Sequence, residues 1–423
     1  MRRKAFSLNP GLWILLLCLI CTGCGNTEFL DEIPKEYAVR REISGKSQGG
    51  IPEEVLEDTP CETEPEVVSF LMEEAFHFAF DRLSPAEQIW YRDMERILGS
   101  FGTKARLSDE GLEAGLGESD IDKIFQCVLC DHPELFYVEG YSYKKYIRGE
   151  QVRSIEFSGT YQMDPESALA RREEILTEAE VVLDGIGKEA SDYDKVKYVY
   201  ETLICNTEYD QNVPDNQNIY SVFVHHLSVC QGYAKATQYL LNRLGVECTL
   251  VQGTVESGEG HAWNLVKIDD NYYYVDTTWG DVSYRIEEDA SEDGAGTMTW
   301  ESMPQINYDY LNVTTEELLK THTLGGKVPM PVCTAVDANY YIREGALFTS
   351  CDREQMAKVF SSAIEQGRRY VTLKCADAAV YGEVHAALVG RQEIFDYLEA
   401  GSGSIAYSQN EKQYVMTFWV TKE

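Results

Sequence analysis

The sequence predicts an α+β protein in which a helix packs on an antiparallel sheet. Apolar residues recur at helical spacing from Ala234 to Leu244, and the pattern stops at Gly245, a residue typical of helix ends. Three strand-like runs follow, at 248–255, 261–268 and 272–278. Because the last two are separated only by a polar turn, they are expected to form an antiparallel hairpin.

Length, composition and charge limit the classes of function. The chain has 423 residues, of which 44% are hydrophobic, so it is long enough for two or three globular domains. Its formal net charge of −34 repels nucleic acid and anionic membrane surfaces. We therefore expect no nucleic-acid partner, and the charge is compatible with a folded part that works outside the cell.

The N-terminus has the features of an export signal. Arg2, Arg3 and Lys4 precede an apolar run at 12–20 that is too short to span a membrane. The following Cys-Thr-Gly-Cys24 resembles the lipidation site of bacterial lipoproteins, although Cys21 stands where that family usually has Leu. The expectation is a signal peptide at 1–23, a lipid on Cys24, a cell-surface location and membrane contact only through that lipid. An ordinary cleaved signal and an uncleaved anchor are the alternatives.

The segment before the central unit divides into two parts. Residues 24–66 are rich in Glu, Pro, Gly and Ser and predict a flexible acidic tether. Residues 67–188 predict a mainly helical region with a short β segment. Its expected helices cover 67–83, 85–98 after a capping box at Ser84, 119–131 and 165–186, and its strands lie within 136–161.

The cysteine pattern does not predict a disulfide framework. Nine of the 12 cysteines follow Cys24, and an odd number leaves at least one free thiol. Cys127 and Cys130 form a lone CxxC in an apolar helical run, which favours buried helix cysteines over a metal or redox site. His132, beside the end of the same run, is expected to be a helix-end or packing residue rather than a catalytic one. No motif has metal-ligand spacing, so neither a metal nor another cofactor is expected.

The central unit, 189–328, carries the chemistry. It begins with a helix at 193–205. Cys230 falls in the first turn of the next helix, with Ser228 as the expected cap, where free N–H groups and the helix dipole stabilise a thiolate. The hairpin brings His261 near Asp276, so a nucleophile, a base and an orienting acid lie within one stretch. His225 and His226 are rival bases, but no acid is placed to orient them.

Three motifs resemble the transglutaminase-like superfamily: Cys230-Gln-Gly-Tyr-Ala, His261-Ala-Trp-Asn, and Tyr-Val-Asp276-Thr-Thr-Trp. The resemblance covers residues 190–325. It implies a papain-like core and thiol acyl chemistry, with Cys230, His261 and Asp276 as the catalytic residues. The implied substrate is a peptide or protein, with the cell envelope as one source.

The residues that flank these motifs are the candidates for substrate contacts: Gln231, Tyr233, Trp263, Asn264 and Trp279. Trp263 and Trp279 are expected to wall the cleft, and Gln231 either contacts substrate or caps the helix. The acidic stretch at 283–305 is either a lid or an inert insertion. A catalytically silent binding module tethered to the envelope is the alternative to an enzyme, because the superfamily also includes members that keep the fold without the chemistry.

The C-terminal part, 329–423, predicts a small α/β module. Strand-like runs lie at 340–342, 370–375, 404–407 and 414–420, with helices at 352–366 and within 377–400. No residue in it forms a recognisable catalytic pattern, and His385 lies in a helical pattern typical of a structural residue.

Overall fold

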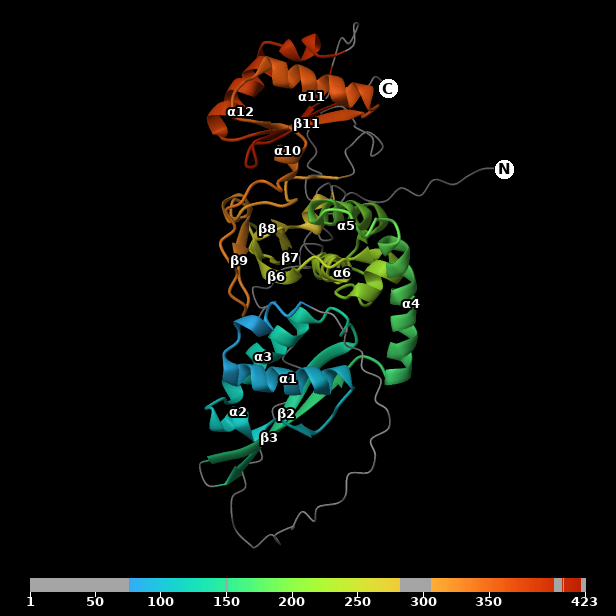
Figure 1. Ribbon diagram of the computed structural model, residues 1–423, viewed down its shortest axis with the longest axis vertical. Helices are drawn as coiled ribbons and strands as arrows, with labels where there is room; N and C mark the ends of the chain where they lie inside the picture. The colour runs from blue at the N-terminus through green and yellow to red at the C-terminus, as the bar shows by residue number, and fades with distance from the viewer. Residues whose placement is uncertain (1–75, 149–150, 282–305, 399–404, 406, 420–423) are drawn as a thin grey trace, which may run out of the picture.

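The computed structural model describes residues 76–148, 151–281, 306–398, 405 and 407–419. Several predicted regions lie outside these residues: the signal peptide, Cys24, the acidic tether and the stretch at 283–305. Along the longest axis the described chain forms three tiers (Figure 1), with the N-terminal region at one end and the C-terminal module at the other. None of the described helices has the length and apolar character needed to cross a membrane.

The N-terminal tier packs helices against a three-stranded antiparallel sheet of order β1-β3-β2. Its elements are α1 (Pro85–Gly99), β1 (Ala105–Arg106), α2 (Asp109–Glu113), α3 (Glu118–Asp131), β2 (Val138–Arg148) and β3 (Gln151–Tyr161), and α4 (Pro165–Leu183) leads to the next tier. The predicted capping box at Ser84 is present. The strands expected within 136–161 are present as β2 and β3, with 11 residues each.

The helix expected at 67–83 is not found in its described part. Residues 76–83 contain only the 3-10 turn η1 (Phe80–Arg82). The carboxylate of Asp131 accepts hydrogen bonds from the backbone N–H groups of Ala79 and Phe80, at 2.8 and 3.0 Å. These tertiary bonds hold a tight turn where the local apolar pattern predicts a continuous helix.

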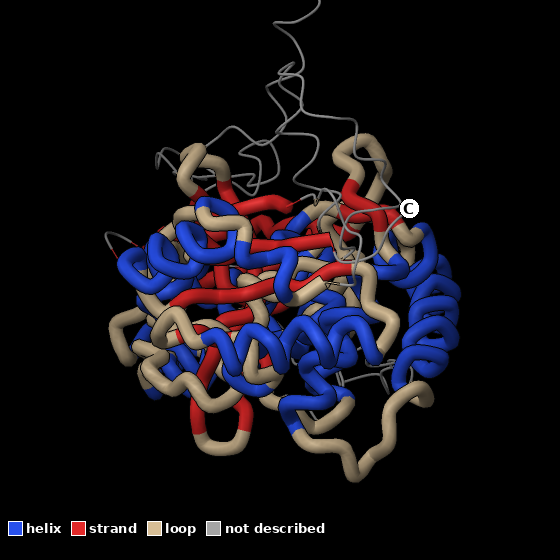
Figure 2. Tube along the Cα trace, turned by 90° about the horizontal axis from the view of Figure 1, so that it is seen from above, coloured by secondary structure: helices blue, strands red, loops and turns tan. Residues whose placement is uncertain are grey.

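The middle tier contains the expected helix on an antiparallel sheet. The helices are α5 (Asp192–Asn206) and α6 (Cys230–Arg243), and the four-stranded sheet has the order β8-β7-β6-β9. Its strands are β6 (Cys248–Val255), β7 (Gly260–Ile268), β8 (Asn271–Val275) and β9 (His322–Leu324), and the short helices α7 (Thr277–Gly280) and α9 (Thr315–Leu318) follow β8. Seen along the long axis, strands run through the centre with helices around them (Figure 2).

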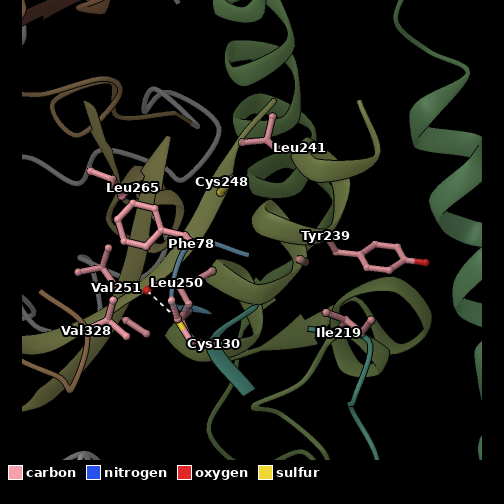
Figure 3. Packing of buried hydrophobic residues seen from close by; sticks show 14 of the residues in the cluster. Phe78, Cys130, Ile219, Tyr239, Leu241, Cys248, Leu250, Val251, Leu265 and Val328 are labelled. Carbon is pink, nitrogen blue, oxygen red and sulfur yellow. Dashed lines mark hydrogen bonds between the residues drawn. The ribbon is translucent and has the colours of Figure 1, made fainter. Parts of the chain in front are cut away.

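One continuous hydrophobic core joins the first two tiers, from Phe78 to Ala338. Figure 3 shows Cys130 of α3 beside Leu250 and Val251 of β6, where the Cys130 thiol donates to the Leu250 carbonyl at 3.3 Å. Cys127 and Cys130 are both buried, which confirms them as core residues of a helix. The N-terminal region is therefore packed directly on the sheet that carries the candidate site.

The C-terminal tier has its own core under a sheet of order β10-β11-β13-β12. Its elements are α10 (Tyr340–Arg343), β10 (Leu347–Phe348), α11 (Arg353–Glu365), β11 (Tyr370–Cys375), α12 (Ala378–His385), η4 (Ala386–Gly390), η5 (Glu393–Asp396), β12 (Tyr407–Asn410) and β13 (Val415–Trp419). The strand expected at 340–342 is instead α10, because the Asn339 side chain caps a helical turn there.

Gly253 allows β9 to approach β6 closely. It lies between His261 of β7 and Leu324 of β9 in the sheet register. A Cβ at this position would lie 2.0 Å from the Thr323 carbonyl oxygen and 2.6 Å from the Trp263 ring. Because the nearer atom is backbone, a side chain could be accommodated only by moving β9.

We predict that Gly253→Ala lowers the free energy of unfolding by about 1–3 kcal/mol, the usual cost of overpacking a tight contact. Gly187→Ala is the matched control, since a Cβ there meets nothing within 4 Å. Its effect should stay within about 0.5 kcal/mol. Urea denaturation of both variants measures the difference, and equal midpoints would contradict the close approach of β9.

Candidate active site

Cys230 is the first residue of α6 and is buried, with 5% of its surface exposed. The first N–H groups of a helix have no acceptor within the helix, and the dipole places partial positive charge there. The start of α6 therefore favours negative charge on the Cys230 sulfur. It equally favours negative charge on a substrate oxygen that lies next to the sulfur.

The cap of this helix differs from the prediction. Val229, not Ser228, is the N-cap residue, and its side chain makes no capping hydrogen bond. The Ser228 hydroxyl donates to the Asn216 carbonyl at 2.6 Å and lies 2.8 Å from the Ser221 hydroxyl. Ser228 therefore holds the segment before α6 in place and does not cap the first turn of the helix.

Gly232 makes room for that arrangement. A Cβ on Gly232 would lie 1.9 Å from the Ser228 hydroxyl and 3.0 Å from the Asn216 carbonyl oxygen. The Cys-Gln-Gly order thus has a steric basis, because the chain before α6 passes directly over the first turn. Gln231, on the other side of this turn, is partly exposed.

His261 and Asp276 meet as the hairpin prediction requires. His261 is the second residue of β7, and Asp276 directly follows β8, which pairs with β7 up to Val275. The Asp276 Oδ1 atom accepts the Trp279 N–H at 3.0 Å as the N-cap of α7. Its Oδ2 atom lies 2.8 Å from His261 Nε2. The turn into α7 directs the carboxylate to the imidazole.

The electrostatic environment favours the charged form of His261. Burial alone would lower its pKa, but the negative charge and hydrogen bond of Asp276, together with a hydrogen bond to Cys230, raise the pKa to about 10. Because Asp276 occupies Nε2, Nδ1 is the nitrogen that faces the thiol. The imidazole thus links Cys230 to Asp276.

His322 is a fourth member of the cluster that the sequence did not reveal. Its Nε2 atom lies 3.0 Å from the same Asp276 Oδ2 atom, and its Nδ1 atom lies 2.9 Å from the Thr321 hydroxyl. Burial and the charge of His261 lower the His322 pKa, although Asp276 opposes this. A neutral His322 donates from Nε2 to Asp276 and accepts from Thr321 at Nδ1.

Asp276 is fully buried, and both imidazoles hold its pKa below the usual range despite that burial. His322 comes from β9, 46 residues after Asp276, and only the pairing of β9 with β6 brings it to the site. No local spacing could have indicated it. The ring of Trp279 packs 4.6 Å from the His322 ring, centroid to centroid, and closes the cluster on one side.

Three of the five predicted substrate-contact residues need correction, because their side chains are buried. Tyr233 donates its hydroxyl to the Thr207 carbonyl at 2.7 Å. Asn264 donates to the Ala234 carbonyl at 2.9 Å, and Trp263 stacks against the His261 ring at 5.8 Å. All three have 0% exposure and support the site from inside the core. Gln231 and Trp279 remain partly exposed candidates for substrate contact.

The rival histidines lie apart from this cluster. His225 ends the π-helical turn η2 (Ser221–His225), and both His225 and His226 are exposed. No described carboxylate is paired with either of them in the way that Asp276 is paired with His261. The structure therefore gives neither of them the orienting acid that a base in this site would need.

Comparison with known proteins agrees with this geometry. The family model of the transglutaminase-like superfamily matches residues 180–277, which include Cys230, His261 and Asp276. This match supports the transglutaminase-like superfamily for the matched segment, and the α+β fold has a transglutaminase-like core. The model does not extend to β9, where His322 lies.

Individual relatives are distant and match only in part. Kyphoscoliosis peptidase of Mus musculus is 26% identical over 117 residues, which are 24% of this chain and 18% of that protein. The crystal structure of a TGase is similar over 39% of this chain and 56% of its own, with 16% identity and a TM-score of 0.25. The periplasmic domain of TgpA from Pseudomonas aeruginosa covers 31% of this chain and 55% of its own, with 17% identity and a TM-score of 0.20.

We predict that His322→Ala slows alkylation of Cys230 by iodoacetamide, because Asp276 loses a donor and orients His261 less firmly. The buried carboxylate left with fewer partners should also lower the free energy of unfolding by about 1–3 kcal/mol. His322→Gln, which keeps an N–H donor, should restore part of the alkylation rate.

His226→Ala is the control, since His226 is exposed and outside the cluster. The measurement is the Cys230 alkylation rate by mass spectrometry between pH 5 and 9 for all variants. A pH profile for His322→Ala that coincides with that of His226→Ala would show that His322 has no part in positioning the pair.

Proposed function

We propose that this protein is a thiol enzyme that acts on amide bonds of peptides or proteins through a Cys230 thioester. The observation that carries the proposal is the His261–Asp276 contact of 2.8 Å, together with the hydrogen bond between the same imidazole and Cys230 at a helix start. A buried helix-start cysteine that served packing alone would need neither an imidazole nor an ionised partner beyond it.

The first half of the reaction follows from this arrangement. The Cys230 sulfur attacks the amide carbonyl carbon, a C–S bond forms, and the carbonyl oxygen becomes negative. The Cys230 backbone N–H, at the start of α6, is the donor that we assign to that oxygen. His261 then gives a proton to the amide nitrogen, the C–N bond breaks, and the amine leaves with the acyl group held as a thioester.

The second half returns the enzyme to its starting state. Water or a primary amine attacks the thioester carbonyl, and His261 accepts the proton of the attacking group. The C–S bond breaks, and the product is a carboxylic acid with water or a new amide with an amine. Asp276, held by His322 and the Trp279 N–H, keeps the His261 ring in place through both halves.

Of the two acceptors, we favour water at least as strongly as an amine. The relative from Mus musculus is named a peptidase. Among the described residues we identify no lid that would keep water away from the thioester while an amine attacks it. The charge of −34 attracts lysine side chains and basic peptides, which suits either an amine donor or a basic peptide to be cleaved.

The proposed location is the outer face of a bacterial membrane. It rests on the basic start, the apolar run at 12–20 and Cys24, which together match an exported lipoprotein. In this setting the substrate is a peptide or protein of the envelope or its surroundings. Mass spectrometry of the mature N-terminus tests this, and an unlipidated N-terminus at another residue would contradict it.

We predict that Cys230→Ser and His261→Ala abolish turnover, whereas Asp276→Asn keeps a small residual rate because the base is still present but poorly oriented. The assay incubates a glutamine-containing protein with a labelled primary amine and monitors both amine incorporation and peptide cleavage. Cys205→Ser, at an exposed cysteine outside the site, is the control and should keep full activity.

The products decide between the two acceptors. Cleavage without amine incorporation supports hydrolysis, and amine incorporation without cleavage assigns the protein as a transferase. If the wild type and Cys230→Ser bind a peptide equally and neither changes it, the protein is a binding module and the proposal fails.

A further inference from the structure

A second cluster of histidine and carboxylate side chains lies in the N-terminal tier, away from Cys230. His77 precedes η1, Glu95 is on α1, and His132 is the C-cap residue of α3. The ligand atoms that these three residues offer lie within 4.8 Å of one another. None of them takes part in the proposed reaction.

The distances in this cluster are close to those of a tetrahedral zinc site. His132 Nε2 lies 2.9 Å from Glu95 Oε1, and His77 Nε2 lies 3.9 Å from the same oxygen. Zn–N and Zn–O bonds of about 2.0–2.2 Å place neighbouring ligand atoms roughly 3.3–3.5 Å apart in a tetrahedron. Shifts of about half an ångström bring each imidazole nitrogen to that distance from the Glu95 oxygen, and the two imidazole nitrogens, which lie within 4.8 Å of each other, complete the triangle once they also close to it.

Glu134 adds the outer contact that metal-binding histidines usually have. The His132 Nδ1 atom lies 2.8 Å from Glu134 Oε1, and the His132 side chain is 1% exposed. This carboxylate accepts from the Nδ1–H group and fixes the ring, while Nε2 donates to Glu95 at 2.9 Å; a zinc ion would take the place of the proton on Nε2. A buried histidine is thus held with one nitrogen aimed into the cluster.

Access and donor chemistry both favour a transition-metal ion. The side chains of His77 and Glu95 are 38% and 21% exposed, so an ion can enter and water can occupy the fourth position. Two imidazoles and one carboxylate suit Zn²⁺, whereas Ca²⁺ and Mg²⁺ prefer oxygen ligands alone. The net charge of −34 also concentrates cations near the protein.

We propose that His77, Glu95 and His132 form a zinc site that fastens the segment around η1, residues 77–82, to α1 and α3. The segment is already tied to α3 by the Asp131 bonds to Ala79 and Phe80. Phe78 packs against Tyr272 of β8, with ring centroids 6.0 Å apart, so zinc at this point also anchors the segment to the sheet of the middle tier. The ligands come from three separate elements, and for that reason their spacing in the sequence shows no metal motif.

The test is isothermal titration calorimetry of the full chain with Zn²⁺ in chelator-free buffer. All proteins carry Cys230→Ser, which removes the thiol of the candidate active site as a competing ligand. The variants are His77→Ala and Glu95→Gln, both at partly exposed positions, and His225→Ala is the control at an exposed histidine. Thermal unfolding with and without Zn²⁺ shows whether each variant is folded.

The expected result is one tight zinc ion per chain in the background protein and in His225→Ala. Affinity should fall roughly tenfold or more in His77→Ala and Glu95→Gln. Zinc should raise the melting temperature of His225→Ala but not that of His77→Ala. If no zinc binds tightly, or if both cluster variants keep the same stoichiometry and affinity, the proposal is overturned. A further variant, His322→Gln, tests the other cluster at His261, Asp276 and His322. If zinc binding survives in both cluster variants and is lost in His322→Gln, the ion lies at Asp276 and the proposal is overturned as well.

Discussion

The carboxylate of Asp276 is the charge on which the candidate site depends. It is completely buried, and a buried carboxylate is costly unless hydrogen bonds and opposite charge surround it. His261 and His322 share its Oδ2 atom, and the Trp279 N–H takes its Oδ1 atom. In return the negative charge keeps His261 protonated beside Cys230, so the chemistry at the sulfur depends on how completely Asp276 is enclosed.

The fold supplies these partners from separate elements. The β7–β8 hairpin brings His261 to Asp276, and the turn into α7 supplies the backbone donor. β9 delivers His322 only because Gly253 lets it approach β6. The Thr237 hydroxyl of α6 lies 2.9 Å from the Thr277 hydroxyl of α7, which holds the helix carrying Cys230 against the element that begins at Asp276.

Local patterns were sufficient for the parts of this arrangement that are close in sequence. The end of α6 just before Gly245, the hairpin, and the approach of His261 to Asp276 all follow from periodicity and turn residues. His322 could not be found in that way, because its place is set by strand pairing between distant segments. The same reason applies to Tyr233, Trp263 and Asn264: a motif shows which residues stand together, but not which side chains the core covers.

The most direct test of this account is the protonation state of His261, read by NMR from its ring nitrogens. The structure predicts a pKa of about 10, so the ring is an imidazolium at pH 8 in the wild type and loses its proton near pH 10. Since this pKa is above the unfolded value of about 6.5, the pair stabilises the fold fully below pH ~6.5 and loses that effect as pH rises through about 10. In Asp276→Asn the His261 titration should move down by several units. A wild-type His261 that titrates near 6.5, or one that does not respond to Asp276→Asn, would contradict the account.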